Sequence, residues 1–218
     1  MGAALLMQEF AAVLGGHLDW QARLEPETVD SGLPNIRLPR GCLTEVLGPA
    51  SSGRTTLLYS ILASATGRGE LCALVDADGA FDPDSATIAG VHLSKVLWIN
   101  CGNSVENSLK ATDLLVQGGG FGVVAMDLGD ASQQMTRRIS LTSWFRLRRA
   151  VENTPTVLVT LARQSHAKTC ASLMLECRRE RTMWSGNRSG RLFRGMQVRA
   201  TATERRKACT PVFTARAI

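Results

Sequence analysis

Short apolar runs alternate with helical patterns along most of the chain. Five runs rich in aliphatic residues predict strands at 43–47, 71–76, 95–100, 121–127 and 154–162. The stretches between them predict helices at 55–66, 83–90, 104–118 and 133–152. Near-continuous apolar strands separated by helices are typical of a parallel sheet covered on both faces. The pattern therefore predicts an α/β fold.

The pattern changes after residue 170. The segments "SLMLEC" and "RGMQVRATAT" predict antiparallel strands that close one edge of the sheet, and "SGNRSG" at 185–190 predicts a turn between them. At the other end, "MGAALLMQEFAAVLGG" has no basic leading region, and Gln8 and Glu9 interrupt its apolar residues. We therefore expect an amphipathic N-terminal helix there and not a signal peptide.

Composition narrows the class of protein. With 218 residues, 44% of them hydrophobic, the chain can form one compact domain of ordinary size. No apolar run approaches the roughly 20 residues that span a bilayer, so we expect a cytoplasmic protein with no membrane partner. The six cysteines include no C-x-x-C pair, and we expect reduced thiols, without a disulfide or zinc framework.

Charge is unevenly distributed. From residue 177 to the end there are eleven Lys and Arg against two Asp and Glu, whereas the preceding 176 residues have fourteen against seventeen. A basic tail on a near-neutral domain favours a polyanionic partner such as nucleic acid, and a solubilising tail is the alternative. The helix predicted at 133–152 is also rich in arginine, which fits either a DNA contact or a solvated face. The candidate DNA-binding residues are Arg137, Arg138, Arg146, Arg148, Arg149, Arg163 and Lys168, together with the arginines after residue 177.

The stretch "GPASSGRT" at 48–55 lies between a predicted strand and a predicted helix. It fits the phosphate-loop pattern G-x-x-x-x-G-K-[ST], except that Arg54 replaces lysine. The cradle of such a loop is mostly backbone N–H groups and a helix N-terminus, so it survives the change. Arginine keeps the charge, but its planar group is a poor substitute for a compact ammonium. We therefore expect nucleotide binding to be better preserved than hydrolysis. The candidate binding residues are Gly48, Pro49, Ala50, Ser51, Ser52, Gly53, Arg54, Thr55 and Thr56.

Two acidic positions follow other predicted strands. "FGVVAMD" ends in Asp127, which with the Thr55 hydroxyl predicts a Mg²⁺ site. "LVDADGAFDP" places Asp78 where the carboxyl ends of parallel strands face a ligand, so Asp78 could orient or deprotonate an attacking water. The alternative is a turn and helix cap, with Asp82 capping and Pro83 in the first helical position. Both can hold at once.

These segments together resemble the core of RecA-type recombinases. "PNIRLPRGCLTEVLGPASSGRTTLL", "ALVDADGAFDPDSATIAGVHLSKVLWIN" and "GGGFGVVAMDLGD" follow one another with similar spacings, and "KTCASLMLECRR" and "GMQVRATATERRK" resemble the family's closing segments. The resemblance covers 28–208. It implies a RecA-like nucleotide-binding core at 28–208, an N-terminal helix and linker at 1–27, and a short C-terminal tail at 209–218. It also implies ATP and Mg²⁺ as ligands, with Asp78 in the position of the catalytic glutamate.

Departures from the family pattern accompany the resemblance. Besides Arg54, Asp78 is shorter than the family's glutamate, and Arg163 stands where a glutamine couples ATP to DNA, with Gln164 one position on. Both DNA loops are short, the second reduced to about "RQSHAKT". The chain is therefore most similar to the ImuA branch, RecA-like accessory proteins of translesion synthesis in bacteria.

That similarity implies an ATP-binding accessory protein in DNA repair and SOS damage tolerance, with weak or absent hydrolysis. Its implied partners are DNA, chiefly single-stranded, and repair proteins such as a translesion polymerase or RecA. Head-to-tail homo-oligomers are also implied, since RecA-type proteins stack in this way. A slow DNA-stimulated ATPase and a nucleotide-free scaffold remain the alternatives.

Overall fold

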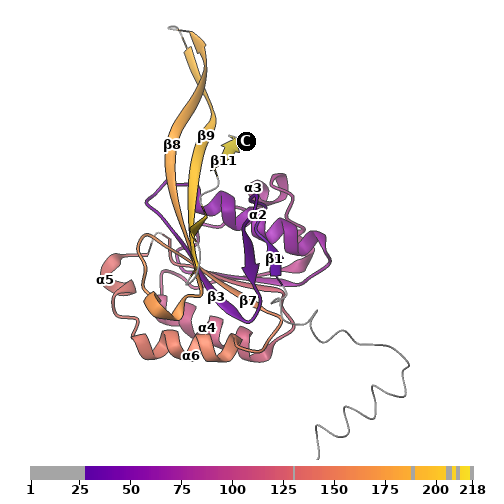
Figure 1. Ribbon diagram of the computed structural model, residues 1–218, viewed down its shortest axis with the longest axis vertical. Helices are drawn as coiled ribbons and strands as arrows, with labels where there is room; N and C mark the ends of the chain where they lie inside the picture. The colour runs from indigo at the N-terminus through magenta and orange to yellow at the C-terminus, as the bar shows by residue number, and fades with distance from the viewer. Residues whose placement is uncertain (1–27, 130, 188–189, 205–207, 210–211, 217–218) are drawn as a thin grey trace, which may run out of the picture.

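A computed structural model describes residues 28–129, 131–187, 190–204, 208–209 and 212–216 (Figure 1). The N-terminal helix predicted within residues 1–27 lies outside them. The strands are β1 (Thr28–Asp30), β2 (Arg37–Pro39), β3 (Cys42–Leu47), β4 (Cys72–Asp76), β5 (Val96–Asn100), β6 (Val123–Asp127), β7 (Val157–Ala162), β8 (Leu173–Asn187), β9 (Gly190–Glu204), β10 (Ala208–Cys209) and β11 (Val212–Arg216). The helices are α2 (Arg54–Gly67), α3 (Pro83–Ile88), α4 (Val105–Gly118), α5 (Gln133–Thr136) and α6 (Leu141–Val151), with short 3-10 turns η2 (Leu93–Lys95) and η3 (Lys168–Cys170).

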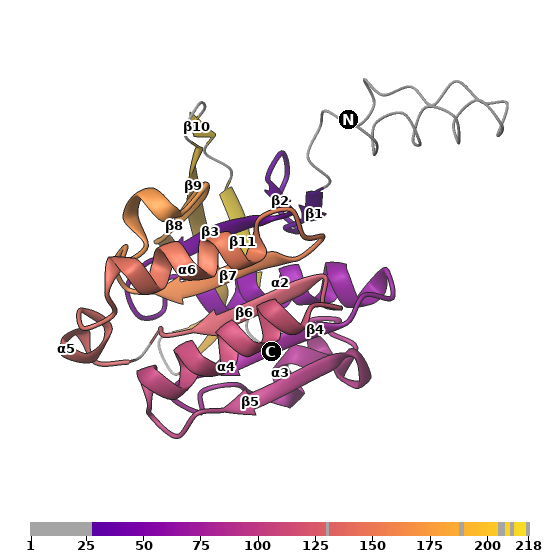
Figure 2. The same ribbon diagram turned by 90° about the horizontal axis from the view of Figure 1, so that it is seen from below.

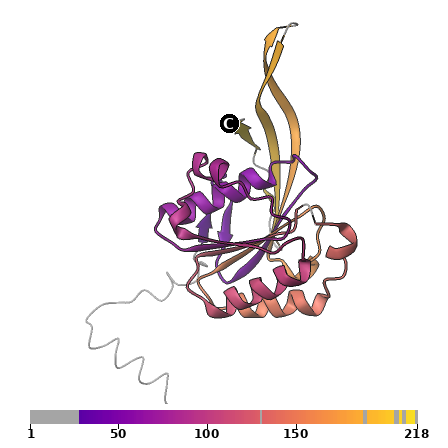
Figure 3. The ribbon, with the colours of Figure 1, turned by 180° about the vertical axis from the view of Figure 1, so that it is seen from behind.

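One nine-stranded sheet organises the described part of the chain. Its order is β10-β9-β8-β3-β7-β6-β4-β5, and β11 pairs with β9. Strands β8, β3, β7, β6, β4 and β5 run parallel, while β9 is antiparallel to β8. Helices α2 and α3 lie on one side of the sheet and α4, α5 and α6 on the other (Figures 1 and 3). The prediction of an α/β fold with helices on both faces and antiparallel strands at the C-terminal edge is confirmed.

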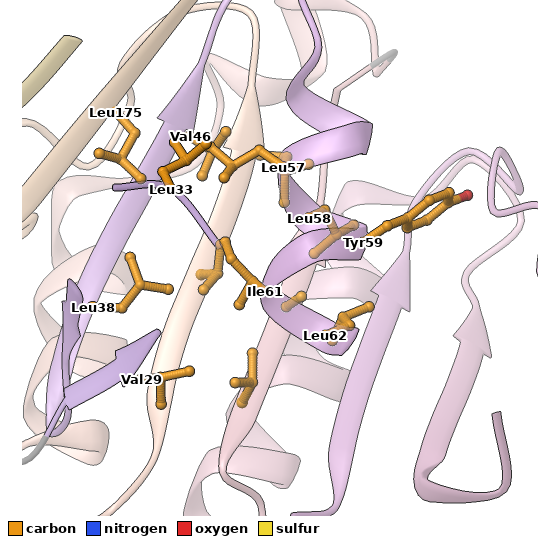
Figure 4. Packing of buried hydrophobic residues seen from close by; sticks show 14 of the residues in the cluster. Val29, Leu33, Leu38, Val46, Leu57, Leu58, Tyr59, Ile61, Leu62 and Leu175 are labelled. Atoms are coloured by element: carbon orange, nitrogen blue, oxygen red, sulfur yellow. The ribbon is translucent and has the colours of Figure 1, made fainter. Parts of the chain in front are cut away.

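Helix α2 holds the phosphate-loop segment against the sheet. Its residues Leu57, Leu58, Ile61 and Leu62 are buried and pack against β3 and the small β1–β2 hairpin, as Figure 4 shows. Burial of each such side chain contributes about 1.5–3 kcal/mol. The N-terminus of α2, where the phosphate loop ends, is therefore fixed relative to β3.

The opposite face has its own core, beneath α4 and α6 (Figure 2). Trp144, Leu147 and Val151 lie one helical turn apart on α6 and are all buried. The helix predicted at 133–152 is interrupted, however, and forms the separate helices α5 and α6. Ser140 causes the restart, since its hydroxyl accepts the backbone N–H of Ser143 (3.1 Å) as an N-cap.

The basic C-terminal segment is not a tail. Strands β8 and β9 pair from Leu173↔Glu204 to Asn187↔Gly190 and form a long hairpin that protrudes from the body (Figures 1 and 3). Beyond residue 208, β11 pairs with β9 from Val212 to Arg216. Of the predicted turn at 185–190, residues 188–189 lie outside the described residues, and the others belong to the two strands. The sequence did not predict the full length of β8 and β9, because exposed polar residues on both faces remove the apolar–polar alternation typical of a strand.

Two composition-based expectations can be checked. The five cysteines at 42, 72, 101, 170 and 177 are free, and all except Cys42 are buried. Among the described helices, none has the length and apolarity required to cross a membrane.

Candidate functional site

The carboxyl ends of the parallel strands carry all the predicted nucleotide-site residues. The loop after β3 begins at Gly48 and reaches α2 through Gly53, which has a left-handed backbone (φ 90°) that glycine adopts without strain. Ser51 is also left-handed (φ 56°). A Cβ on Gly48 would overlap the carbonyl oxygen of Cys177, so this loop lies directly against the base of the β8–β9 hairpin.

The end of the phosphate loop leaves several polar groups without a capping partner, although the Ser52 N–H donates to the Pro49 carbonyl oxygen (3.2 Å). No side chain caps the N-terminus of α2. The Ser52 hydroxyl is buried, and no hydrogen-bond partner is recorded for it among the described residues. Thr55 and Thr56 are exposed in the first turn of α2. Uncapped N–H groups, a helix dipole and an unsatisfied hydroxyl form a suitable cradle for a phosphate group.

Arg54 is buried at the start of α2, beside the phosphate loop. The residue is only 8% exposed, and its Nη1 donates to the carbonyl oxygen of Gly129 in the loop after β6 (3.2 Å). Arg163 reaches the same oxygen from the loop after β7, through Nε (3.1 Å). The two arginines that depart from the RecA pattern therefore meet at one carbonyl group.

Asp127 lies beside this junction. Burial raises the pKa of its carboxyl group to about 6, although the Gly129 N–H (2.7 Å from Oδ1) and the charge of Arg54 act in the opposite direction. Asp76 and Asp78 contribute a smaller upward effect. A metal ion bound beside Asp127 would favour the ionised form of the carboxyl group and so oppose this shift. In the described residues no three acidic, His or Cys side chains cluster as a metal site would require, so further ligands would have to come from hydroxyls, water or phosphate.

Asp78 lines a pocket with Arg54, Thr55, Tyr59 and Asp127. Its backbone is held by Asp76, a buried residue whose carboxylate accepts five hydrogen bonds. The donors are the N–H groups of Asp78 (3.3 Å), Gly79 (2.9 Å), Ala80 (3.2 Å) and Phe81 (3.0 Å) and the indole of Trp98 (3.2 Å). The helix-cap interpretation also holds, because Asp82 accepts the Ser85 N–H (3.3 Å) and Pro83 begins α3.

Glu45 was not singled out by the sequence analysis. It lies buried in β3, and its carboxylate accepts the N–H groups of His166 (3.0 Å) and Ala167 (2.9 Å) and the hydroxyl of Ser165 (2.7 Å). It thereby folds the loop after β7 into a tight turn. The available signal was a single acidic residue within the apolar run "LTEVL", because a buried carboxylate requires donors from elsewhere in the chain.

The predicted DNA-binding residues divide into two groups. Burial lowers the pKa of His166, and the nearby charge of Arg137 lowers it further, while Glu45 acts in the opposite direction. Arg137 therefore lies close to His166. Arg137, Arg163 and Lys168 thus lie at the carboxyl edge of the sheet, and Arg138 follows Arg137 in the turn after α5. Arg148 and Arg149 are in the last turn of α6, which leads to the opposite end, where β7 begins. Arg146 pairs with Asp113 of α4 (3.3 Å).

The strand order, the phosphate loop and the acidic strand ends define an α/β protein of the P-loop class. Comparison with known families gives a match between residues 26–136, about half of the chain, and the RecA N-terminal domain. The chain belongs to this RecA family.

Individual relatives agree with the family match. The chain is 35% identical to Protein RecA of Chlorobium chlorochromatii over 136 residues, which is 56% of this chain and 38% of that protein. It is 40% identical to Protein RecA of Pseudomonas fluorescens (strain SBW25) over 90 residues, 41% of this chain and 25% of that protein. The matched regions thus span well under half the length of these relatives.

Proposed function

We propose that this protein is a RecA-like, ATP-binding accessory protein of DNA repair and SOS damage tolerance, of the ImuA type, that hydrolyses ATP slowly or not at all. Family membership supports the link to repair and recombination. Nucleotide binding with weak hydrolysis is supported by one contrast. The N-terminus of α2 is uncapped, whereas Arg54, in the position of the family's lysine, donates to the carbonyl oxygen of Gly129.

Nucleotide binding is supported by the backbone of Gly48–Thr56. These residues would hold the phosphates of ATP, and the buried Ser52 hydroxyl would gain a partner. Thr55 and Asp127 would hold Mg²⁺, which neutralises phosphate charge when bound. Neither the phosphate-binding residues nor the Mg²⁺-binding residues include the lysine that Arg54 replaces.

Weak hydrolysis is supported by three side chains. Arg54 is buried and donates to the carbonyl oxygen of Gly129. Arg163 bonds the same carbonyl oxygen, in the place of the family's coupling glutamine. Asp78 would orient water, but its backbone is fixed by Asp76 and its side chain is shorter than glutamate. Positioning errors of about 1 Å can cost a hundredfold in rate.

ATP binding and turnover of the full chain, with and without Mg²⁺ and oligo-dT, would test this proposal. We expect Mg²⁺-dependent binding and turnover near background with or without DNA. Arg54→Lys should raise turnover, because lysine removes the bond to Gly129 and restores a flexible ammonium. Arg68→Lys, at the other end of α2, is the matched control and should change nothing.

Two results would contradict the proposal. Rapid, DNA-stimulated turnover by the wild type would indicate the ATPase alternative. Failure to bind ATP would indicate a scaffold that retains only the fold.

DNA binding would use the cluster Arg137, Arg163 and Lys168 at the carboxyl edge. Replacing all three with Gln should weaken oligo-dT binding and reduce the slope of log affinity against log salt, by about 0.7 for each lost contact on single strands. Arg148→Gln with Arg149→Gln tests the opposite end of α6 and should have a smaller effect. Equal effects would mean that the carboxyl edge is not the DNA surface.

Protein partners are proposed from the family and from β5. This strand is an edge of the described sheet and exposes Leu97 and Trp98. An uncovered apolar edge favours pairing with another chain, which fits a homo-oligomer or a repair partner such as RecA or a translesion polymerase. Leu97→Lys should reduce self-association in sedimentation if copies of this chain use that edge.

A further inference from the structure

The base of the β8–β9 hairpin lies against the phosphate loop, and its outer part extends away from the same edge of the sheet. Strand β8 pairs with β3 only as far as Glu176 and then continues for eleven residues, Cys177–Asn187, about 35 Å of strand. On the other side β11 pairs with β9 only as far as Gly195. Beyond these points, among the described strands, β8 and β9 pair only with each other, and Figures 1 and 3 show them projecting from the body.

An aromatic pair lies on this projecting part. Trp184 and Phe193 are cross-strand partners with ring centroids 5.3 Å apart at 67°. They remain 53% and 38% exposed. The Trp184 indole N–H donates to the Thr182 hydroxyl (3.1 Å), which orients the ring. Leu192 is 57% exposed, but it precedes Phe193 and therefore points to the opposite face of the hairpin.

Arginines surround the pair. Residues 177–199 include seven arginines and one glutamate. Glu176 and Glu180 pair with Arg178 and Arg199, and Arg194 donates to Ser185 (2.7 Å). Of the other four, Arg188 lies outside the described residues, and within the described part of the chain no hydrogen bond or ion pair engages Arg179, Arg181 or Arg191.

We propose that the hairpin is a binding arm for single-stranded nucleic acid, on which an unpaired base stacks against Trp184 and Phe193 while Arg179 and Arg191 contact phosphates. Exposed rings combined with free cations suit a ligand that has both π-faces and negative charge. The bases of a duplex are stacked on one another, so their faces are not accessible to Trp184 and Phe193. An acidic protein surface would pair with the arginines but would leave the two rings without a stacking partner. The inference rests on the proposed DNA binding and adds a separate surface to it.

The pair also contributes to the hairpin itself, because aromatic cross-strand pairs stabilise antiparallel strands. Any aromatic side chain at position 184 would stabilise the hairpin in this way. Stacking a base additionally requires the ring to be accessible. A test must therefore separate folding of the arm from contact with the ligand.

Binding of labelled oligo-dT to the full chain provides this test. Trp184→Ala should weaken binding about tenfold or more, the effect typical of one lost stacking contact. Trp184→Phe should bind nearly as the wild type does, because it keeps an aromatic face. Leu192→Ala, the control for exposed apolar surface on the other face, should bind unchanged.

A second measurement does not depend on the alanine variant. A base stacked on an indole changes its fluorescence, so oligo-dT should alter the tryptophan emission of the wild type and not that of Trp184→Phe. An emission change that persists in Trp184→Phe would overturn the proposal. Equal weakening by Trp184→Ala and Leu192→Ala would overturn it too, as would equal competition by the matching duplex.

The outcomes also separate this proposal from the function proposed above. If ATP fails to bind but oligo-dT binding depends on Trp184, the arm stands and the nucleotide proposal fails. If Trp184→Ala binds oligo-dT like the wild type while the Arg137/Arg163/Lys168 variant does not bind it, the arm fails and the carboxyl-edge surface stands.

Discussion

Two kinds of loop follow the strands at the carboxyl edge of this sheet, and they differ in what their backbone N–H groups donate to. The loop after β3 turns on glycines and leaves α2 uncapped. The loops after β4 and β7 wrap around carboxylates of the protein itself, Asp76 and Glu45. In these two loops the protein supplies its own anion, whereas the loop after β3 leaves that place to a ligand.

Under the function proposed above, this difference would allow nucleotide binding to persist where hydrolysis is lost. A cradle made of backbone tolerates the replacement of Lys by Arg54, because its donors do not change. Catalysis depends on side chains, and here the side chains of Arg54 and Arg163 are bonded to Gly129. Loss of activity can therefore leave the fold and the phosphate loop unchanged.

Removing the internal anion of the β4 loop should have the largest effect. Asp76→Ala leaves four backbone N–H groups and the Trp98 indole without their acceptor. We expect a loss of roughly 4 kcal/mol in the free energy of unfolding, measured by urea titration. Asp84→Ala, an exposed residue of α3, is the control. A change within 0.5 kcal/mol, about the usual effect of a surface substitution, would show that Asp76 does not hold the loop.

Asp127→Asn should act in the opposite direction. The pKa of Asp127 in the folded protein, about 6, lies above its ordinary 3.8. The folded state therefore loses stability as the pH rises from about 4 through 6. A gap of about two pH units corresponds to about 3 kcal/mol. The variant should match the wild type near pH 4 and be more stable by about this amount at pH 8, where it should also lose Mg²⁺-dependent ATP binding.

The control for this prediction is Glu106→Gln. Lys110 lowers the pKa of Glu106, so this variant should lose stability above the ordinary pKa of the group. Thermal unfolding of both variants between pH 4 and 8 would compare the two. A stabilisation by Asp127→Asn that does not vary with pH would contradict the role of burial.

Glu45→Gln sharpens the comparison at the β7 loop. The amide keeps one oxygen for His166 and Ala167 but loses the charge. We expect a loss of about 1–2 kcal/mol, and faster amide hydrogen exchange at 166–167 than elsewhere. Unchanged exchange at these two positions would mean that the turn does not depend on the carboxylate.

Arg163→Ala should have the smallest effect on stability. The residue is exposed, and its bond to Gly129 contributes about 0.5–1 kcal/mol. This variant is informative when it is compared with Arg54→Ala. The second variant removes a buried guanidinium from the same carbonyl oxygen and should reduce the free energy of unfolding by more. Equal losses of unfolding free energy would show that burial of Arg54 adds nothing.

Much of the strand and helix pattern could be predicted, and the misses have physical reasons. The apolar strands from β3 to β7 and helix α4 lie within a few residues of their predicted positions, because a buried parallel strand needs a continuous apolar run. Ser140 interrupted a helix that looked continuous, since its cap competes locally with the helical hydrogen bonds. The two antiparallel strands of the hairpin were predicted, but their length was missed because the outer residues are exposed and carry no core signal.

The sequence by itself determined which loop could bind phosphate. Gly48, Gly53 and their position between a strand and a helix are local properties, set by backbone conformation and chain order. Only the tertiary structure decided where the charged side chains go. Arg54 and Arg163 meet at Gly129 from 75 and 34 positions away, and Glu45 bonds Ser165 across 120 positions of sequence. Such pairings follow from strand order in the sheet, because a buried charge takes whichever partner the fold brings within reach.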